Sequence, residues 1–195
     1  MKQKVYHSND MLSQEEEEIL KMIEDWMDND IKAMISGKCN VSCATLLSVF
    51  MEVLGGIANG TLMEKGKEKD RFEAFLRLPW IPKQYKTLNY KLSRERDGKG
   101  LYQLYRCNLV HTFVFGGLKI ENDPTKPTSR VLPEDIPGIR EADDGSGRLI
   151  INCNDLAYDI KKARERLFKE IREGDNVYRK NFRKVLFINL NSSIV

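Results

Sequence analysis

One apolar segment limits what this chain can fold into. Residues 41–58 are apolar nearly all round, and Glu52 is the only charged residue among them. Such a segment is typical of a helix that packs centrally among other helices. A carboxylate within it costs free energy unless it is paired, protonated or exposed at a rim, so Glu52 either has a partner or points to solvent or to a helix end. The segment favours a mainly α-helical fold.

The same segment does not predict a membrane span. Before Glu52, the longest stretch without a charged residue covers residues 39–51, whereas a membrane helix needs about 20 apolar residues. Residues 1–10 contain a basic pair with no apolar run behind it, so we expect no secretory signal. The sequence therefore predicts a cytoplasmic protein without a membrane partner.

Length and composition predict one folded domain. The 195 residues are 41% hydrophobic and 31% charged, which excludes a disordered or fibrous protein. Residues 1–12 are expected to be a flexible lead-in, and residues 13–195 a single helical domain. The four cysteines form no CxxC pair and only two histidines are present, so we expect core thiols, no metal and no other cofactor.

The first helix is expected to begin at a capping box and to end at a glycine. Ser13 and Glu16 have the spacing of that box, apolar residues then recur at three and four, and Gly37 is placed to end the helix. In the apolar segment that follows, Gly55 and Gly56 either weaken the helix or permit close approach of another backbone.

The C-terminal part is predicted to contain a basic helix. Apolar residues step at three or four over residues 156–171, after a cap at Asn154 or Asp155, and Gly174 ends the run. Residues 156–195 carry ten Lys or Arg against five Asp or Glu, whereas residues 1–31 carry three against nine. This polarity suits an anionic ligand or a neighbouring subunit, and composition does not choose between them.

The middle of the chain is predicted to be less regular. A short helical piece at residues 72–76 precedes a turn with two prolines, and residues 62–100 carry eleven Lys or Arg against six Asp or Glu. This excess suits either a phosphate-binding surface or a solvated loop. Short strands at residues 118–120, 139 and 149–151, with a turn at 143–147 and a proline-containing loop at 122–137, predict a β-hairpin insertion at about residues 116–152.

One short motif carries recognisable chemistry. It reads Arg106-Cys107-Asn108-Leu109-Val110-His111 and lies in a breaker-free stretch that is predicted to be helical. On an α-helix Asn108 and His111 share a face, but Arg106 lies about 140° from His111 around the axis. Arg106 must then reach around the helix or meet a second copy of the motif. A single histidine on a helix is more often a hydrogen-bonded core residue than a catalyst.

These residues match the R-x4-H signature, and the chain resembles the HEPN family (higher eukaryotes and prokaryotes nucleotide-binding) over about residues 13–172. Two N-terminal helices, a motif helix introduced by Leu-Tyr-x-Leu-Tyr and a following basic helix support the resemblance. It implies a HEPN-like antiparallel helical bundle, here with the β-hairpin insertion before the C-terminal basic helix. Family members are often metal-independent ribonucleases, and many are thought to bind rather than cut. Active members often have a polar residue directly after the arginine, where this chain has Cys107.

The chemistry that the resemblance implies is RNA cleavage by attack of the 2′-hydroxyl. His111, with a pKa near about 6.5, can act as acid or base, and Arg106 can stabilise the phosphorane. Asn108 would orient an oxygen or hold the His111 tautomer. His7 lies in the predicted lead-in, so each chain offers one imidazole, and a homodimer would bring two together. Such an RNA-cutting dimer would suit a toxin or defence component, with a cognate antitoxin as a further partner.

Two other interpretations remain open. A non-catalytic module of the same fold could hold a nucleotide or nucleic acid through Arg106, Asn108 and the basic residues Arg164 and Arg166. Alternatively, a structural dimerisation protein could use Arg106 only as the ion-pair partner of Glu52. In each case Tyr102 and Tyr105 are expected to support the site by packing in the core or at its rim.

Overall fold

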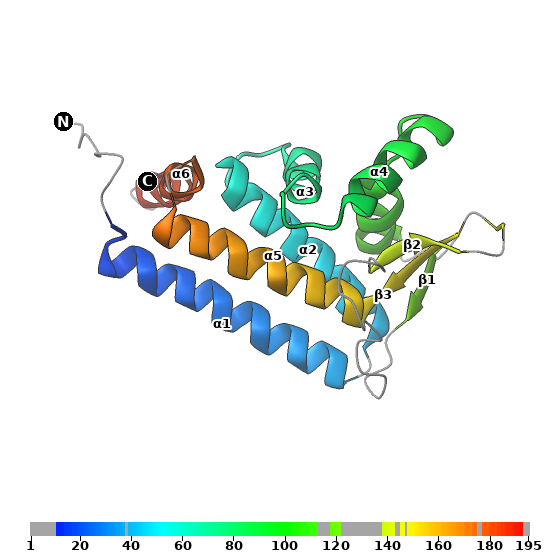
Figure 1. Ribbon diagram of the computed structural model, residues 1–195, viewed down its shortest axis with the longest axis horizontal. Coiled ribbons are helices and arrows are strands. Elements are labelled where there is room, and N and C mark those ends of the chain that lie inside the picture. The colour runs from blue at the N-terminus through cyan, green and yellow to red at the C-terminus, as the bar shows by residue number, and fades with distance from the viewer. Residues whose placement is uncertain are drawn as a thin grey trace.

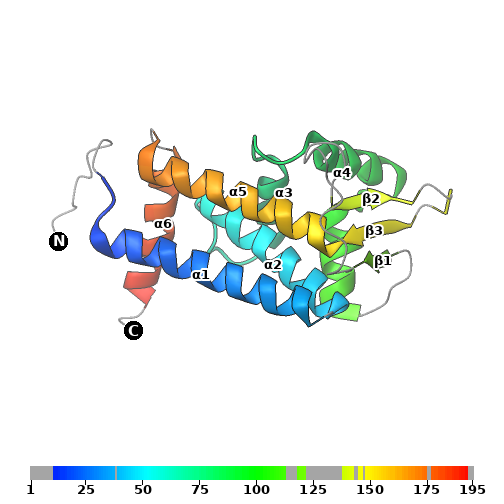
Figure 2. The same cartoon turned by 60° about the horizontal axis from the view of Figure 1, so that its bottom comes forward.

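Three long helices form the body of the fold. α1 (Gln14–Ser36), α2 (Asn40–Asn59) and α5 (Cys153–Glu173) lie side by side, as Figures 1 and 2 show. The computed structural model describes residues 11–37, 39–112, 118–121, 138–142, 145–146, 148–174 and 177–192. Within these ranges seven helices accompany a small three-stranded sheet, which confirms the prediction of a mainly α-helical protein with a small β insertion. Most of the predicted lead-in, residues 1–10, lies outside them.

α2 is the central helix. It contacts α1, α3, α5, α6 and η1, and twelve of its residues are buried, as the apolar segment predicts. Among the described residues it alone is long and apolar enough to cross a membrane by length and composition. However, 67% of its most apolar window is buried inside the fold, and the core helix of a soluble protein passes the same test.

The predicted helix ends are largely confirmed. The Ser13 hydroxyl accepts a hydrogen bond from the Glu16 backbone at 3.2 Å, the Glu16 carboxylate accepts one from the Ser13 backbone at 2.8 Å, and Gly37 caps the other end of α1. Gly174 ends α5. The cap predicted at Asn154 or Asp155 is wrong: Asn152 caps α5, because its side-chain oxygen accepts hydrogen bonds from both of those backbone nitrogens.

α3 (Glu68–Leu76) packs closely against α2 at Gly55. A Cβ added at Gly55 would overlap the carbonyl oxygen of Arg71 and would lie 2.8 Å from the backbone nitrogen of Phe75. Of the two roles predicted for this glycine, close approach of another backbone is therefore the one that the structure contains.

Two helices were not predicted. α4 (Lys83–Glu95) has only a few apolar residues at helical spacing, of which Tyr85 and Leu92 are buried, and Pro82 is its N-cap. α6 (Val177–Ser192) crosses the end of the fold where α1 begins and packs on α2 and α5 (Figure 2). The sequence signal of α4 is weak because only four of its 13 residues are apolar.

The sheet lies beside the first turn of α5. β3 (Leu149–Asn152) is its central strand, with β2 (Ile139–Glu141) antiparallel on one side and β1 (Leu118–Glu121) parallel on the other. The predicted hairpin is confirmed as β2 and β3, and the strand predicted at residues 118–120 is β1, whose parallel pairing with β3 was not predicted. Residues 122–137, predicted as a loop, and parts of the 143–147 turn lie outside the described residues.

Candidate functional site

The R-x4-H motif lies on η1 (Tyr102–Thr112), which is a π-helix. A π-helix is stabilised by hydrogen bonds between residues five apart, so such residues lie about one turn apart, on roughly the same side. The α-helical expectation that separated Arg106 from His111 by about 140° is therefore wrong for this segment. The observed helix type places positions 106 and 111 on one side of η1.

Tyr105 attaches η1 to the centre of the protein. Its ring is fully buried and packs edge-on against Phe72, with ring centroids 6.3 Å apart. Its hydroxyl donates a 2.6 Å hydrogen bond to the carbonyl oxygen of Ala44 in α2. Burial raises the pKa of Tyr105 well above its ordinary value, so the hydroxyl remains a donor. Tyr105 has the core packing role that was predicted for it.

Arg106 and Glu52 form an ion pair at the junction of η1 and α2. The Arg106 Nε atom donates a hydrogen bond to Glu52 Oε1. Glu52 is only 6% exposed, and the Arg106 side chain is 15% exposed. Burial alone would lower the pKa of Arg106, but the hydrogen bond and charge of Glu52 raise it above the ordinary value. Of the alternatives left open for Glu52, the structure contains the ion pair with Arg106, whose guanidinium remains charged.

The pairing uses only one edge of the Arg106 guanidinium. Its two terminal nitrogens have no hydrogen bond to any described residue. Neither of them is among the buried side-chain atoms that lack a hydrogen-bond partner. The guanidinium carbon lies 5.9 Å from the centroid of the Tyr102 ring, a cation–π distance. An arginine held at Nε in this way retains donors for a second anion.

Arg71 is the second cation near Glu52, and sequence reasoning missed it. Its Nη2 atom lies 4.0 Å from Glu52 Oε2 and 3.4 Å from Glu68 Oε1. Its Nη1 atom donates hydrogen bonds to the carbonyl oxygens of Thr61 and Glu64, at 3.3 and 2.8 Å. Arg71 therefore holds the connection between α2 and α3 in place. A signal was present, because Arg71 lies four residues before the buried Phe75, on the apolar side of α3.

Tyr102 lies between the aromatic core and Arg106. Its ring centroid is 5.7 Å from that of Phe72, in an edge-on arrangement. Burial raises the pKa of Tyr102 to about 12, and a hydrogen bond with Cys107 adds to the effect. Tyr102 is therefore a neutral phenol at the rim of the ion-pair cluster.

The other two motif residues are placed less favourably for the predicted chemistry. The Asn108 side chain donates a 3.1 Å hydrogen bond to the carbonyl oxygen of Leu104, one turn back on its own helix. The backbone of His111 belongs to η1, but its side chain lies outside the part of the chain that the structure describes. The described site therefore consists of Glu52, Arg106 and Tyr102, with Arg71 beside them.

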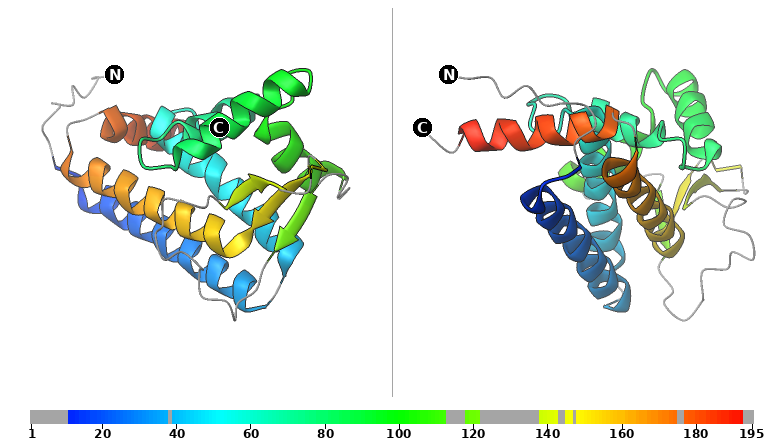
Figure 3. Two further views of the ribbon diagram at one scale, coloured as in Figure 1. Left: turned by 45° about the vertical axis from the view of Figure 1, so that its right-hand side comes forward. Right: turned by 60° about the vertical axis from the view of Figure 1, so that its left-hand side comes forward.

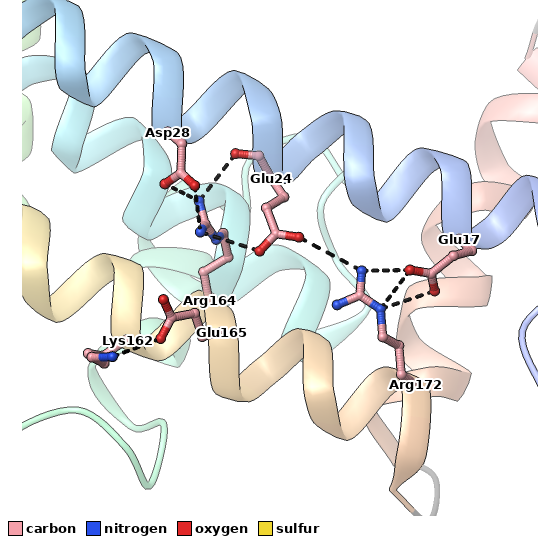
Figure 4. Close-up of polar contacts among 7 residues, drawn as sticks. All are labelled: Glu17, Glu24, Asp28, Lys162, Arg164, Glu165 and Arg172. Carbon is pink, nitrogen blue, oxygen red and sulfur yellow. Dashed lines mark hydrogen bonds and ion pairs between the residues drawn. The ribbon is translucent and has the colours of Figure 1, made fainter.

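Arg164 was predicted as a ligand-binding residue on the outer face of α5, and the structure places it elsewhere. It is 1% exposed and bonds to Asp28 through both terminal nitrogens, at 2.8 and 3.1 Å, inside the contact between α1 and α5 (Figure 4). Arg166 is exposed on the same helix. Neither arginine makes an ion pair with the Glu52–Arg106 cluster among the described residues.

The charge polarity of the chain has an explanation within one molecule. Arg172 of α5 lies 2.7 Å from Glu17 of α1, and Arg183 of α6 lies 2.7 Å from Glu16 (Figure 4 shows the first pair). Together with Arg164, these contacts pair the acidic N-terminal helix with the basic C-terminal helices. The polarity therefore requires neither an anionic ligand nor a second subunit.

Comparisons with known proteins add nothing to this geometry. No model of a known protein family matches the chain, and no curated protein and no solved structure is detectably similar to it. Within the described ranges, no group of three or more His, Cys, Asp or Glu side chains is arranged to hold a metal ion.

Proposed function

We propose that this chain is a HEPN-like RNA-binding protein that acts as a metal-independent endoribonuclease. The observation that supports the proposal most is the π-helical geometry of η1, which brings positions 106 and 111 to one side of the helix. π-helical segments are rare and occur frequently at functional sites. A motif arginine and a motif histidine on one side can act on the same phosphodiester.

Arg106 has the features of a phosphate-binding residue in this proposal. Glu52 fixes its Nε atom and keeps the guanidinium charged, while the terminal nitrogens retain donors that suit two phosphate oxygens. During cleavage, the 2′-oxygen attacks phosphorus and the bond to the 5′-oxygen breaks. His111 would take the 2′-hydroxyl proton or protonate the leaving 5′-oxygen, and Arg106 would stabilise the phosphorane between these steps.

A homodimer would supply the acid and the base together. Each chain has one motif histidine, and a twofold axis near η1 would place two copies of His111 and Arg106 in one cleft. In a mixed dimer, one His111→Ala subunit should remove most of the activity. Full activity of the mixed dimer would show that the site is not shared.

Two observations favour the alternatives. The amide of Asn108 is bonded to its own helix, and Cys107 follows the arginine, which fits a non-catalytic RNA-binding module. The ion pair between Arg106 and Glu52 also fits a structural role for the arginine.

Digestion of RNA in the presence of EDTA separates these functions. We expect the wild type to cut RNA and to leave cyclic phosphate ends, and His111→Ala to be inactive but folded by circular dichroism. Salt-dependent RNA binding without cleavage would select the non-catalytic module. If neither binding nor cleavage occurs, or if Arg106→Ala and His111→Ala change only stability, the motif is structural.

A further inference from the structure

α4 carries a basic stripe with an exposed aromatic ring, here called the α4 stripe. Lys83, Lys86, Tyr90 and Arg94 follow one another at spacings of three and four, so they share one side of the helix. All four are exposed, and Tyr90 is 66% exposed, while Tyr85 and Leu92 pack into the core. The stripe therefore combines three exposed cations with one exposed aromatic ring.

The cations of the α4 stripe differ from those of the helix body. Arg164, Arg172 and Arg183 are all bonded to acidic residues of α1. In contrast, neither Lys83, Lys86 nor Arg94 forms an ion pair with a residue that the structure describes. Residues 83–99 carry six Lys or Arg against two Asp or Glu. The stripe is therefore a local excess of positive charge that no ion pair with a described residue neutralises.

Tyr90 and Arg94 form a stacking platform on this surface, in which the guanidinium lies over the ring. The guanidinium carbon of Arg94 lies 6.0 Å from the centroid of the Tyr90 ring, and the two residues are one turn apart. Aromatic rings and guanidinium planes are the surfaces on which unpaired bases stack, while lysines beside them contact the phosphate backbone. Because a base in a duplex has no free face, such a platform suits a single strand.

The α4 stripe belongs to the helix that leads into the motif helix. The side-chain oxygen of Asn89 accepts a 2.8 Å hydrogen bond from the backbone nitrogen of Leu101, immediately before η1. A Cβ added at Gly100 would lie 2.7 Å from the Ser93 hydroxyl, so the connection runs tight against α4. Figure 3 shows α4 and the start of η1 at the same end of the fold. A strand bound along α4 would therefore extend toward the motif.

We propose that the α4 stripe is a binding surface for single-stranded RNA, with a base stacked on Tyr90 and phosphates at Lys83, Lys86 and Arg94. RNA as the ligand rests on the proposed function, whereas the position of the surface rests on α4 itself. Arg106 and the α4 stripe then contact one strand at two places.

Fluorescence anisotropy with a labelled single-stranded RNA of mixed sequence tests the α4 stripe. The full chain is used, and every variant also carries His111→Ala so that the RNA is not cut during the measurement. Tyr90→Ala should weaken binding about 5- to 10-fold, the lower end of what loss of one stacked base costs. Tyr90→Phe should bind like the parent because it keeps the ring. The matched control is Tyr158→Ala, which removes a ring under Lys162 at 5.8 Å on α5.

The lysines are tested by salt dependence. In Lys83→Ala/Lys86→Ala, the slope of log affinity against log salt should fall by about 1.4, because each single-strand phosphate contact contributes about 0.7. Lys161→Ala/Lys180→Ala, which removes two exposed lysines of α5 and α6, should change the slope less.

The outcomes distinguish the two proposals. If Arg106→Ala weakens RNA binding but Tyr90→Ala does not, the α4 stripe is overturned and the proposed function stands. If Tyr90→Ala weakens binding but Arg106→Ala does not, the α4 stripe stands and the motif is not the RNA site. Equal losses for single-stranded and duplex RNA in Tyr90→Ala would overturn stacking, and absence of any RNA binding would overturn both proposals.

Discussion

Replacement of Glu52 by glutamine should destabilise the protein, although the two side chains have nearly the same size. The carboxylate is 6% exposed in α2 and faces two guanidinium groups, Arg106 through Nε and Arg71 at 4.0 Å. Glu52→Gln keeps the volume and leaves an amide oxygen for Arg106, but it leaves both cations without their buried counter-charge. The unfavourable term is therefore desolvated positive charge rather than a cavity.

The expected loss is about 2–3 kcal/mol. Breaking a buried ion pair by removing one partner costs about 3–5 kcal/mol. Part of this cost is avoided here, because the Arg106 side chain is 15% exposed and Arg71 keeps two backbone carbonyls and Glu68 as partners. For a chain of this length the loss corresponds to a decrease in Tm of about 5–10 °C.

A double-mutant cycle measures the pair. Equilibrium urea denaturation, followed by circular dichroism at pH 7, gives the free energy of unfolding of the wild type, Glu52→Gln, Arg106→Met and the double variant. Because the double variant removes both charges, it should be more stable than the sum of the single losses predicts, by about 1.5–2 kcal/mol. Glu165→Gln, which breaks an exposed pair with Lys162 on α5, is the matched control and should lose less than about 1 kcal/mol.

Additivity would refute this reasoning. If the two single losses sum to that of the double variant within about 0.5 kcal/mol, Glu52 and Arg106 are not energetically coupled. A Glu52→Gln loss no larger than that of Glu165→Gln would show that the carboxylate is solvated in solution, contrary to its burial.

Three further perturbations have expected outcomes. Gly55→Ala should cost about 3 kcal/mol or more in urea denaturation, because the new methyl group meets the backbone of Arg71 and α3 must move; a loss below about 1 kcal/mol would contradict the close approach. Tyr85→Phe should cost about 1–2 kcal/mol, since its hydroxyl bonds to a buried carboxylate of α5 at 2.6 Å. The Arg164 hydrogen bond lowers the pKa of Asp28 below its unfolded value, so this stability is present above that value and is lost as pH falls through the folded pKa. Below pH about 5, stability should therefore fall less steeply in Asp28→Asn than in the wild type, and identical slopes would contradict the pairing.

Local chemistry made the helix ends and the core helix predictable. The capping box at Ser13 and the terminal glycines Gly37 and Gly174 act within one turn of the chain, so the residues that define them are visible in sequence. The apolar segment also predicted the burial of α2. It left Glu52 either paired or pointing to solvent or to a helix end, and pairing with Arg106, 54 residues away, was one of the interpretations left open.

The placement of Arg164 shows where pattern reading failed. It lies on the same stripe as Ile160, Leu167 and Ile171, at helical spacing, and this stripe is the buried face of α5. Its charge alone favours a place on the basic outer face of the helix, which is the position that the sequence predicts. Its long side chain instead reaches Asp28 across the interface, which only the packing of α1 against α5 determines.

The helix type of η1 could not be read from its residues. Leu101, Tyr105 and Leu109 are buried at a spacing of four, which is compatible with both α- and π-helical geometry. The distinction depends on backbone hydrogen bonds, and in this structure η1 is held against α2 and α3 by Tyr105 and Phe72. The sequence predicted a helix at the motif, whereas the relative orientation of the motif residues came only from the tertiary structure.

A phosphate-binding role and a purely structural role of Arg106 predict different effects on RNA affinity. Glu52→Gln and Arg106→Met both destabilise the fold, because each leaves a buried charge without its partner. They change the local charge in opposite directions, however: the first adds one positive charge at the junction of η1 and α2, and the second removes one. If Arg106 binds phosphate, folded Glu52→Gln should bind RNA more tightly at low salt and folded Arg106→Met more weakly. If Arg106 serves only the fold, RNA affinity of the folded protein should follow neither change. If the two variants change RNA affinity in opposite directions while both lower the stability of the fold, Arg106 is structural and functional at once.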